Sequence, residues 1–346
     1  MLVKFREWAE VLFVGSAVWC GVTFGGEAVP TYGEVRESVE KSYAVRGELL
    51  GGSRGKAKVV LERYEFVGDK GADERRGRKG EGIWGEFEAA SEMRYSADWQ
   101  RAGAKSRFDL DVVETRYAPY VNGEATRQVE RYRVRGTADG KEVFRFSPDE
   151  GRVVIEALPA GRVGGWGYTV QNFSVEKFYR ISGLYTVGEM FAEFEAAGAE
   201  GVISREEVGG RDCVKAVFEV EGEGKRGERY EMWFSESEGY SLVRMLWYRS
   251  GDGGYEIVRS FEAEYGEARN GAGVYVLKRV VQEDVTERGG PGRGWKVSAS
   301  FKDVEVGVDV GEEVFTLAGL RVPEGTGVYR KVEGWVEEFL YSYEGK

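Results

Sequence analysis

Residues 295–302 read Trp295-Lys296-Val297-Ser298-Ala299-Ser300-Phe301-Lys302, a strict alternation of apolar and polar side chains. A period of two places successive side chains on opposite faces of a β-strand. The same alternation occurs in residues 107–112, 214–221 and 256–265, each time with one charged face. Strands with one apolar and one wet face are typical of antiparallel sheets. The sequence therefore predicts a mainly β protein whose antiparallel sheet buries one face.

Short turn signals separate these strands, among them Ala138-Asp139-Gly140 and Arg269-Asn270-Gly271. Gly, Asn and Asp supply the backbone conformations that tight hairpins need. Strands that follow one another in the sequence are therefore expected to be neighbours in a meander. No linker divides the chain, so one domain is predicted over residues 29–346, with the Gly-rich and charged stretch 68–82 as a mobile loop.

Two stretches begin with a capping box, in which a Thr is followed three residues later by a Glu. Thr31 and Glu34 form the first box and predict a short helix over residues 32–44. Thr186 and Glu189 form the second and predict a helix over residues 187–197, with a Gly immediately after it as the stop. The apolar residues of the second helix fall on one helical face, and they are Met190, Phe191 and Phe194.

The first 28 residues have the organisation of a secretory signal peptide. Two basic residues, Lys4 and Arg6, precede an apolar run over residues 11–24, and small residues follow it up to Ala28. The run is too short to cross a bilayer comfortably. We therefore expect a signal peptide over residues 1–28 and an exported protein, a buried N-terminal helix being the alternative. Whether Cys20, inside the run, carries a lipid is left open.

The composition excludes several classes of function. The chain has no His, which removes the usual general base and the favoured zinc ligand. Of two Cys residues, Cys20 lies in the leader and Cys213 stands alone, so no disulfide framework is expected. A net charge of -11 disfavours binding to nucleic-acid phosphates. We therefore predict a protein that is not an enzyme and uses no cofactor or metal.

Aromatic residues are abundant, with 9 Trp, 19 Tyr and 18 Phe. Core packing and cross-strand pairs account for many of them. A half-wet sheet of about ten strands nevertheless has more apolar face than two short helices can cover. Either a second sheet closes over this face, or the face lines a cavity.

Several segments of the chain resemble the LolA/LolB-like family of periplasmic lipoprotein carriers, in particular its divergent outer-membrane lipoprotein-sorting members. The similarity is concentrated in residues 211–330, and segment 126–157 is similar to the family's mid-chain hairpin. The matching motifs are Arg229-Tyr230-Glu231-Met232-Trp233-Phe234, Ser237-Glu238-Gly239-Tyr240, Leu242-Val243-Arg244, Gly273-Val274-Tyr275-Val276-Leu277, Glu313-Val314-Phe315-Thr316-Leu317 and Val322-Pro323-Glu324-Gly325-Thr326.

This resemblance implies an incomplete β-barrel: one strongly curved antiparallel sheet, about ten or eleven strands wide, with two or three short helices as a lid. It also implies a periplasmic or outer-membrane-associated carrier, expected to be a monomer, that holds lipid or a lipidated protein on the concave face. The candidate residues lining that face are Phe108, Leu110, Val112, Phe144, Phe146, Phe218, Phe261 and Phe301, and the candidate lid residues are Met190, Phe191 and Phe194.

Two other functions fit the same residues. The first is an envelope sensor or scaffold that uses the half-barrel to bind a protein partner, which an apolar patch outside a filled interior would favour. The second is an extracellular β-sandwich that binds glycans through exposed aromatic residues such as Trp166. A second sheet closing the core would be its structural sign.

Overall fold

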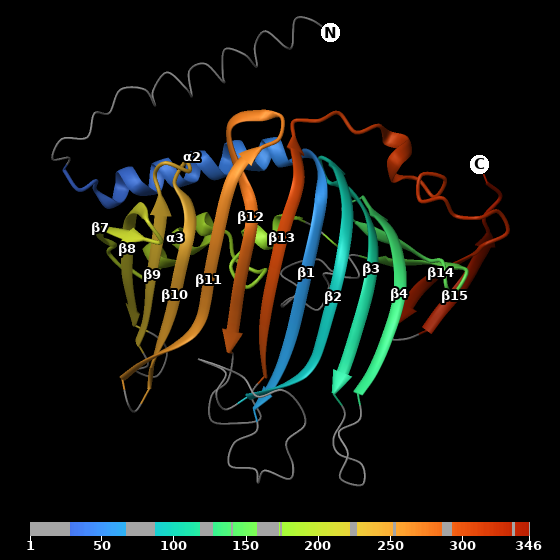
Figure 1. Cartoon of the computed structure of the whole chain (residues 1–346), viewed down its shortest axis with the longest axis horizontal. Helices are drawn as coiled ribbons and strands as arrows, with labels where there is room; N and C mark the ends of the chain where they lie inside the picture. Colours follow the sequence, from blue (N-terminus) through green and yellow to red (C-terminus); the bar gives the residue numbers. More distant parts are fainter. Residues whose placement is uncertain are drawn as a thin grey trace, which may run out of the picture.

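The computed structural model describes residues 28–66, 87–117, 127–139, 141–157, 173, 175–221, 227–251, 254–285, 293–333 and 336–345. The predicted signal peptide, the predicted loop 68–82 and Trp166 lie outside these residues, apart from Ala28. The described strands form one strongly curved sheet of fifteen strands, shown in Figure 1. Its order is β15-β14-β6-β5-β4-β3-β2-β1-β13-β12-β11-β10-β9-β8-β7.

Two meanders build most of this sheet, and each follows the order of the sequence. The first consists of β1 (Gly52–Phe66), β2 (Phe87–Ala102), β3 (Lys105–Tyr117), β4 (Arg127–Ala138), β5 (Glu142–Ser147) and β6 (Arg152–Ala157). The second consists of β7 (Val202–Val208), β8 (Arg211–Glu221), β9 (Gly227–Ser235), β10 (Ser241–Gly251), β11 (Gly254–Ala268), β12 (Gly271–Val285) and β13 (Arg293–Val306). Antiparallel pairing of β1 with β13, in the register Val59 to Ala299, joins them.

The C-terminal strands extend the sheet beyond the ten or eleven strands expected. β14 (Gly327–Glu333) pairs with β6 in parallel, and β15 (Val336–Ser342) pairs with β14. The expected number was therefore too low, and the expected antiparallel arrangement holds for every described strand pair except β6–β14. The turn motifs in the sequence indicate hairpins between consecutive strands. β14 instead joins the sheet through the long connection that follows β13, and no turn motif marks such a connection.

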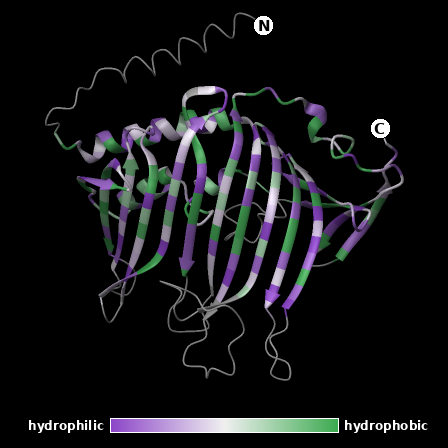
Figure 2. Cartoon of the chain, viewed as in Figure 1, coloured by the Kyte–Doolittle hydropathy of each residue, from purple (hydrophilic) through white to green (hydrophobic). Residues whose placement is uncertain are grey.

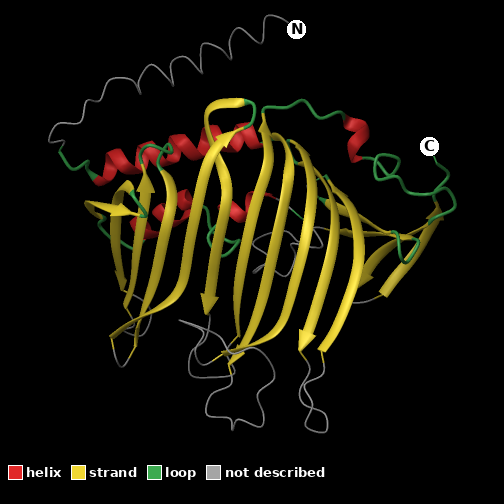
Figure 3. Cartoon of the chain, viewed as in Figure 1, coloured by secondary structure: helices red, strands yellow, loops and turns green. Residues whose placement is uncertain are grey.

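Both predicted helices are present, and both capping boxes are formed. α2 (Tyr32–Leu50) is longer than the predicted 32–44, because its first strong stop is Gly51-Gly52. α3 (Val187–Ala196) ends where expected, with Gly198 in the left-handed region at φ 70°. Two 3₁₀ helices, η4 (Val175–Tyr179) and η6 (Glu312–Phe315), complete the described helical elements, which are drawn in red in Figure 3.

The main core lies between the concave face of the sheet and the helices α2, α3 and η4. Residues paired across adjacent strands point to the same face, and the rows facing inward are apolar, for example Val59, Tyr95 and Val112. The intervening residues are mostly polar, which produces the striped strands of Figure 2. Val35 of α2 and Phe191 of α3 are buried in the same cluster. The sheet thus buries its concave face under short helices.

A second apolar cluster lies on the opposite face of β5 and β6. Phe108 is paired with Gly136, and Gly136 is paired with Arg145, so Arg145 shares the concave face and its neighbours Phe144 and Phe146 point outward. The segment between β13 and β14 packs against them. The second cluster consists of Phe146, Val153, Ile155, Leu320, Val322, Val328 and Tyr343, with Phe144 and Leu317 at its margin.

Candidate functional site

The predicted lining residues fall into two groups. Six are at most 5 % exposed and lie in the main cluster on the concave face: Phe108, Leu110, Val112, Phe218, Phe261 and Phe301. Phe144 and Phe146 belong instead to the cluster on the outer face, so they do not line the concave face. Gly136 makes room for Phe108, since a Cβ at Gly136 would lie 2.1 Å from the Phe108 ring.

The three predicted lid residues lie on the concave face, as the helical pattern indicates. The ring of Phe194 stacks on Phe218 with centroids 4.3 Å apart and contacts Tyr230 at 4.8 Å. Phe191 contacts Phe218 and Phe234, each at 6.0 Å. Met190 is 4 % exposed. α3 therefore contacts the sheet mainly through aromatic side chains.

Helix α2 covers α3 and the sheet together. The ring of Tyr32 packs edge-on against Phe191 of α3 at 6.0 Å and against Phe218 of β8 at 5.4 Å. Arg36 of α2 also forms an ion pair with Glu195 of α3. We call α2 together with residues 175–196 the cover, because these elements lie over the apolar concave face.

Gln282 of β12 attaches the middle of the cover to the sheet. Its Oε1 accepts a hydrogen bond from the Ser182 backbone N–H at 2.7 Å, and its Nε2 donates to the carbonyls of Phe178 and Arg180 at 3.2 and 3.0 Å. Gln282 is 2 % exposed. A buried amide that satisfies three backbone groups of another segment acts as a clamp.

Two further polar contacts reinforce this attachment. The Leu277 backbone N–H donates to the hydroxyl of Tyr179 at 2.9 Å, and burial raises the pKa of Tyr179 to about 12. The phenol therefore remains protonated near neutral pH. Arg101 of β2 forms an ion pair with Glu176 of η4 at 2.5 Å. These polar contacts supplement an interface that is otherwise mainly apolar.

Arg46 near the end of α2 is buried among tyrosine rings. Its Cζ lies 5.0 Å from the ring centroid of Tyr43, 5.1 Å from that of Tyr265 and 5.8 Å from that of Tyr179. Its Nη2 donates to Ser241 Oγ at 2.6 Å, whereas its Nη1 has no hydrogen-bond partner among the described residues. Neither this arginine nor the clamp glutamine was identified from the sequence, because a single charged or amide residue in a strand or helix carries no pattern.

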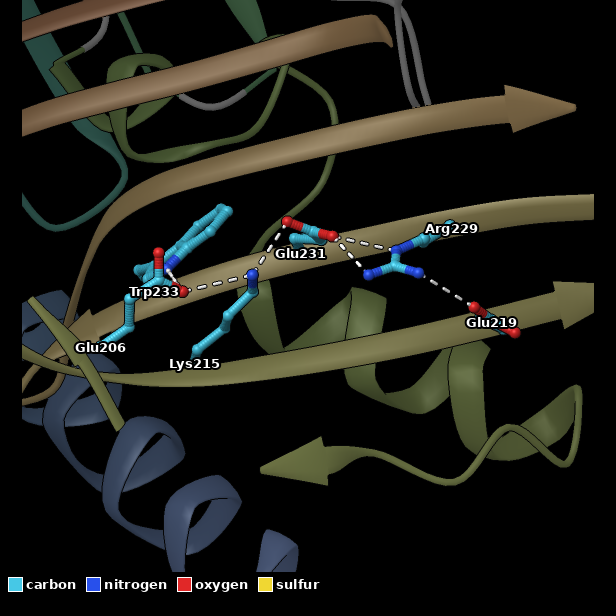
Figure 4. A network of polar contacts seen from close by, with 6 residues as sticks. All are labelled: Glu206, Lys215, Glu219, Arg229, Glu231 and Trp233. Atoms are coloured by element: carbon cyan, nitrogen blue, oxygen red, sulfur yellow. Dashed lines mark hydrogen bonds and ion pairs between the residues drawn. The ribbon is translucent and has the colours of Figure 1, made fainter. Parts of the chain in front are cut away.

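The outer face of β7–β9 carries a network of polar contacts, which Figure 4 shows. Trp233 is covered by Lys215 on β8, whose Nζ lies 4.6 Å from its ring, and its Nε1 donates to Glu206. This hydrogen bond is the main cause of the lowered pKa of Glu206. Lys215 also pairs with Glu231 at 3.1 Å. The chain of contacts links three strands and stabilises this edge of the sheet.

Two features of the described residues concern metal binding and thiol chemistry. No group of three or more His, Cys, Asp or Glu side chains in the described part of the chain is placed to hold a metal ion. Burial raises the pKa of the Cys213 thiol to about 11, which keeps it protonated and unreactive at neutral pH. None of the described helices is both long enough and apolar enough to span a membrane.

The fold is therefore one open, curved sheet with helices over its concave face. No protein-family model and no curated protein sequence matches the chain. Among solved structures, it is similar to a DUF1329 family protein from Desulfovibrio piger, with 10 % identity, a TM-score of 0.39 and coverage of 85 % of this chain and 100 % of that one.

Two further solved structures are similar to the chain. One is a putative outer membrane lipoprotein-sorting protein domain from Vibrio parahaemolyticus, with 10 % identity, a TM-score of 0.35 and coverage of 83 % of this chain and 97 % of that one. The other is LprF from Mycobacterium bovis, with 10 % identity, a TM-score of 0.23 and coverage of 81 % and 96 %.

Proposed function

We propose that the chain is an exported carrier or binding protein that holds a lipid or a lipidated protein on the concave face of its sheet. The observation that carries this proposal is the nature of the cover. In the described part of the chain, helices and not a second sheet bury the apolar concave face, and they do so mainly through side chains such as Phe191 and Phe194. Export is inferred from the leader in residues 1–28.

An acyl chain can replace such a cover with only a small net change in free energy. Burying apolar surface contributes roughly 25 cal/mol per Å² whichever apolar group does the burying. When the ring of Phe194 moves away from Phe218, the bound acyl chain therefore buries the same apolar surface in its place. The polar clamp at Gln282 and the buried Arg46 then determine how easily the cover moves.

The test is lipid binding by the purified mature protein. We expect organic extraction to release a co-purified lipid, and we expect the stripped protein to take up a fluorescent fatty acid saturably. Ala263→Phe, on the concave face of β11, should reduce the uptake because the larger side chain fills the apolar surface. Glu262→Phe is the matched control, since Glu262 lies next to it and points outward. No lipid in the extract together with no uptake would refute the proposal.

One observation favours a second function, the binding of a protein partner. Strand β15 is a sheet edge that exposes Val336, Phe339, Leu340 and Tyr341. Exposed apolar edge strands are sites of β-strand addition. A photo-crosslinking residue at Phe339 should then capture one discrete protein in cells, whereas the same residue at the similarly exposed Val129 of β4 should not. The glycan-binding β-sandwich requires a second sheet, and the described strands form one sheet.

A further inference from the structure

One row of side chains across the concave face combines aromatic and charged groups. Cα pairing places Tyr230, Trp247, Arg259, Asp284 and Trp295 side by side on the consecutive strands β9 to β13. We call these five residues the cross-strand row. Asp284 is two residues beyond the clamp glutamine along β12, a step of about 7 Å on the same face. The row therefore borders the apolar surface that the cover buries.

The centre of the row is tightly packed. The Cζ of Arg259 lies 4.1 Å from the ring centroid of Trp247, and its Nε lies 2.9 Å from Asp284 Oδ2. The ring of Trp247 also contacts that of Tyr230 at 4.9 Å. These contacts fix the positions of one indole, one guanidinium and one carboxylate on three neighbouring strands.

Three polar atoms of this group have no hydrogen-bond partner among the described residues, although all three are buried. They are Trp247 Nε1, Arg259 Nη1 and Asp284 Oδ1. Asp284 as a whole is 8 % exposed. A buried donor or acceptor without a partner costs about 1 to 3 kcal/mol. Two donors and one acceptor therefore lie together without the hydrogen bonds that would compensate for their burial.

We propose that the cross-strand row is a headgroup subsite for an amphiphile whose acyl chain lies on the adjoining apolar face. This inference rests on the proposed function. The ligand class follows from the unpartnered atoms: Trp247 and Arg259 offer hydrogens to oxygen atoms, and Asp284 needs a hydrogen from the ligand. A hydroxyl group both accepts and donates, whereas a carboxylate only accepts. The subsite therefore selects an uncharged, hydroxyl-bearing headgroup, such as the glycerol of a monoacylglycerol, over a free fatty acid.

The position of the cover explains how such a headgroup reaches the row. Phe194 of α3 contacts Tyr230, the first residue of the row, so α3 lies directly beside it. Because the three unpartnered atoms are shielded from solvent, a ligand contacts them only after the cover has shifted. Binding of the acyl chain and binding of the headgroup are thus coupled to the same movement.

The experiment compares two lipids with the same acyl chain, radiolabelled 1-mono-oleoylglycerol and oleic acid, by equilibrium binding to the full mature protein. We expect the glyceride to bind more tightly. Trp247→Phe keeps an aromatic ring next to Arg259 and removes the Nε1 donor. It should therefore weaken glyceride binding about fivefold, which is the change in affinity expected for the loss of one hydrogen bond. Binding of oleic acid should stay unchanged.

Trp233→Phe is the matched control, because the indole of Trp233 lies on the outer face and donates to Glu206. It should lower thermal stability and leave both affinities unchanged. Trp247→Phe should lower the stability of the lipid-free protein less than Trp233→Phe does, since both remove ring volume but only Trp233→Phe breaks a hydrogen bond. Equal affinity for the two lipids, or an equal effect of Trp247→Phe on both, would overturn the headgroup subsite and leave the carrier function standing. Binding of neither lipid would overturn the carrier function itself.

Discussion

Arg46 of α2 donates a hydrogen bond to the hydroxyl of Ser241 on β10, 195 residues further along the chain. This contact joins the cover directly to the sheet. A buried guanidinium normally has a carboxylate partner, because removing a charge from water is expensive. Here three tyrosine rings take that place, with centroids 5.0 to 5.8 Å from Cζ. The arrangement gives α2 a specific position at a cost in stability.

Replacing Arg46 separates the contribution of its bulk from that of its charge. Arg46→Ala should lower the free energy of unfolding by about 2 to 5 kcal/mol, as large-to-small core substitutions do. Arg46→Met fills the space without a buried charge and should stay within about 1 kcal/mol of the wild type. Ser241 keeps its hydrogen bond to the Glu238 carbonyl in both variants. Urea unfolding measures both values, and equal losses would show that the charge itself is stabilising.

The alternation of apolar residues predicted which side chains share a face within each strand. This was sufficient to assign four aromatic residues to the apolar face of their strands, namely Phe108, Phe218, Phe261 and Phe301. It does not say which face of a strand becomes concave. On β5 the aromatic face turned outward, because the segment after β13 packs against Phe146 there. Which face of β5 points outward therefore depends on a contact between residues more than 150 positions apart, and no local pattern in the sequence indicates such a contact.

The clamp and the polar atoms of the cross-strand row could not be found in the sequence either. Gln282, Arg259 and Asp284 are single polar residues in otherwise ordinary strands, and their significance comes from the strand register. The capping boxes, in contrast, are local, and both helices begin where the boxes predict. Local signals specified the elements, and non-local pairing assembled the site.

Gln282→Leu should loosen the cover without disturbing the sheet. The substitution leaves the Ser182 amide and the carbonyls of Phe178 and Arg180 without this partner, which should cost about 2 to 4 kcal/mol in total. Hydrogen exchange should accelerate in residues 175–185 and stay slow in β11–β13. Gln282→Glu keeps the acceptor for Ser182 but places a buried carboxylate beside the carbonyls of Phe178 and Arg180, so it should cost at least as much as Gln282→Leu. Uniform acceleration across the sheet would contradict the role of a clamp.

Phe194→Ala should destabilise the cover and favour the binding of a lipid. The ring stacks on Phe218 and is 4 % exposed, so its removal should cost about 3 kcal/mol in thermal or urea unfolding. Because the same apolar surface then becomes available, uptake of a fluorescent fatty acid should increase. Phe339→Ala is the control for the substitution type. Phe339 is 55 % exposed and packs edge-on against the Tyr329 ring, so its variant should lose no more than about 1 kcal/mol and bind as the wild type does.

Lys177 of η4 gives the cover a dependence on pH. Desolvation lowers the pKa of this half-buried amine to about 8, whereas an unfolded lysine has a pKa of about 10.4. Between these two values the unfolded state binds more protons, so this group makes the free energy of unfolding rise with pH. Below about pH 8 both states are charged, and the folded state carries the full penalty.

Lys177→Met removes that penalty and should therefore stabilise the protein at pH 7, by about 1 to 2 kcal/mol after allowance for partial exposure. The advantage should shrink between about pH 8 and pH 10.5 as the wild-type amine loses its proton in both states. Other groups titrate in this range in both proteins, so the difference between the two urea unfolding curves isolates Lys177. A difference that is constant from about pH 7 to about pH 10.5 would show that the methionine acts through packing and that the amine is not desolvated by the cover.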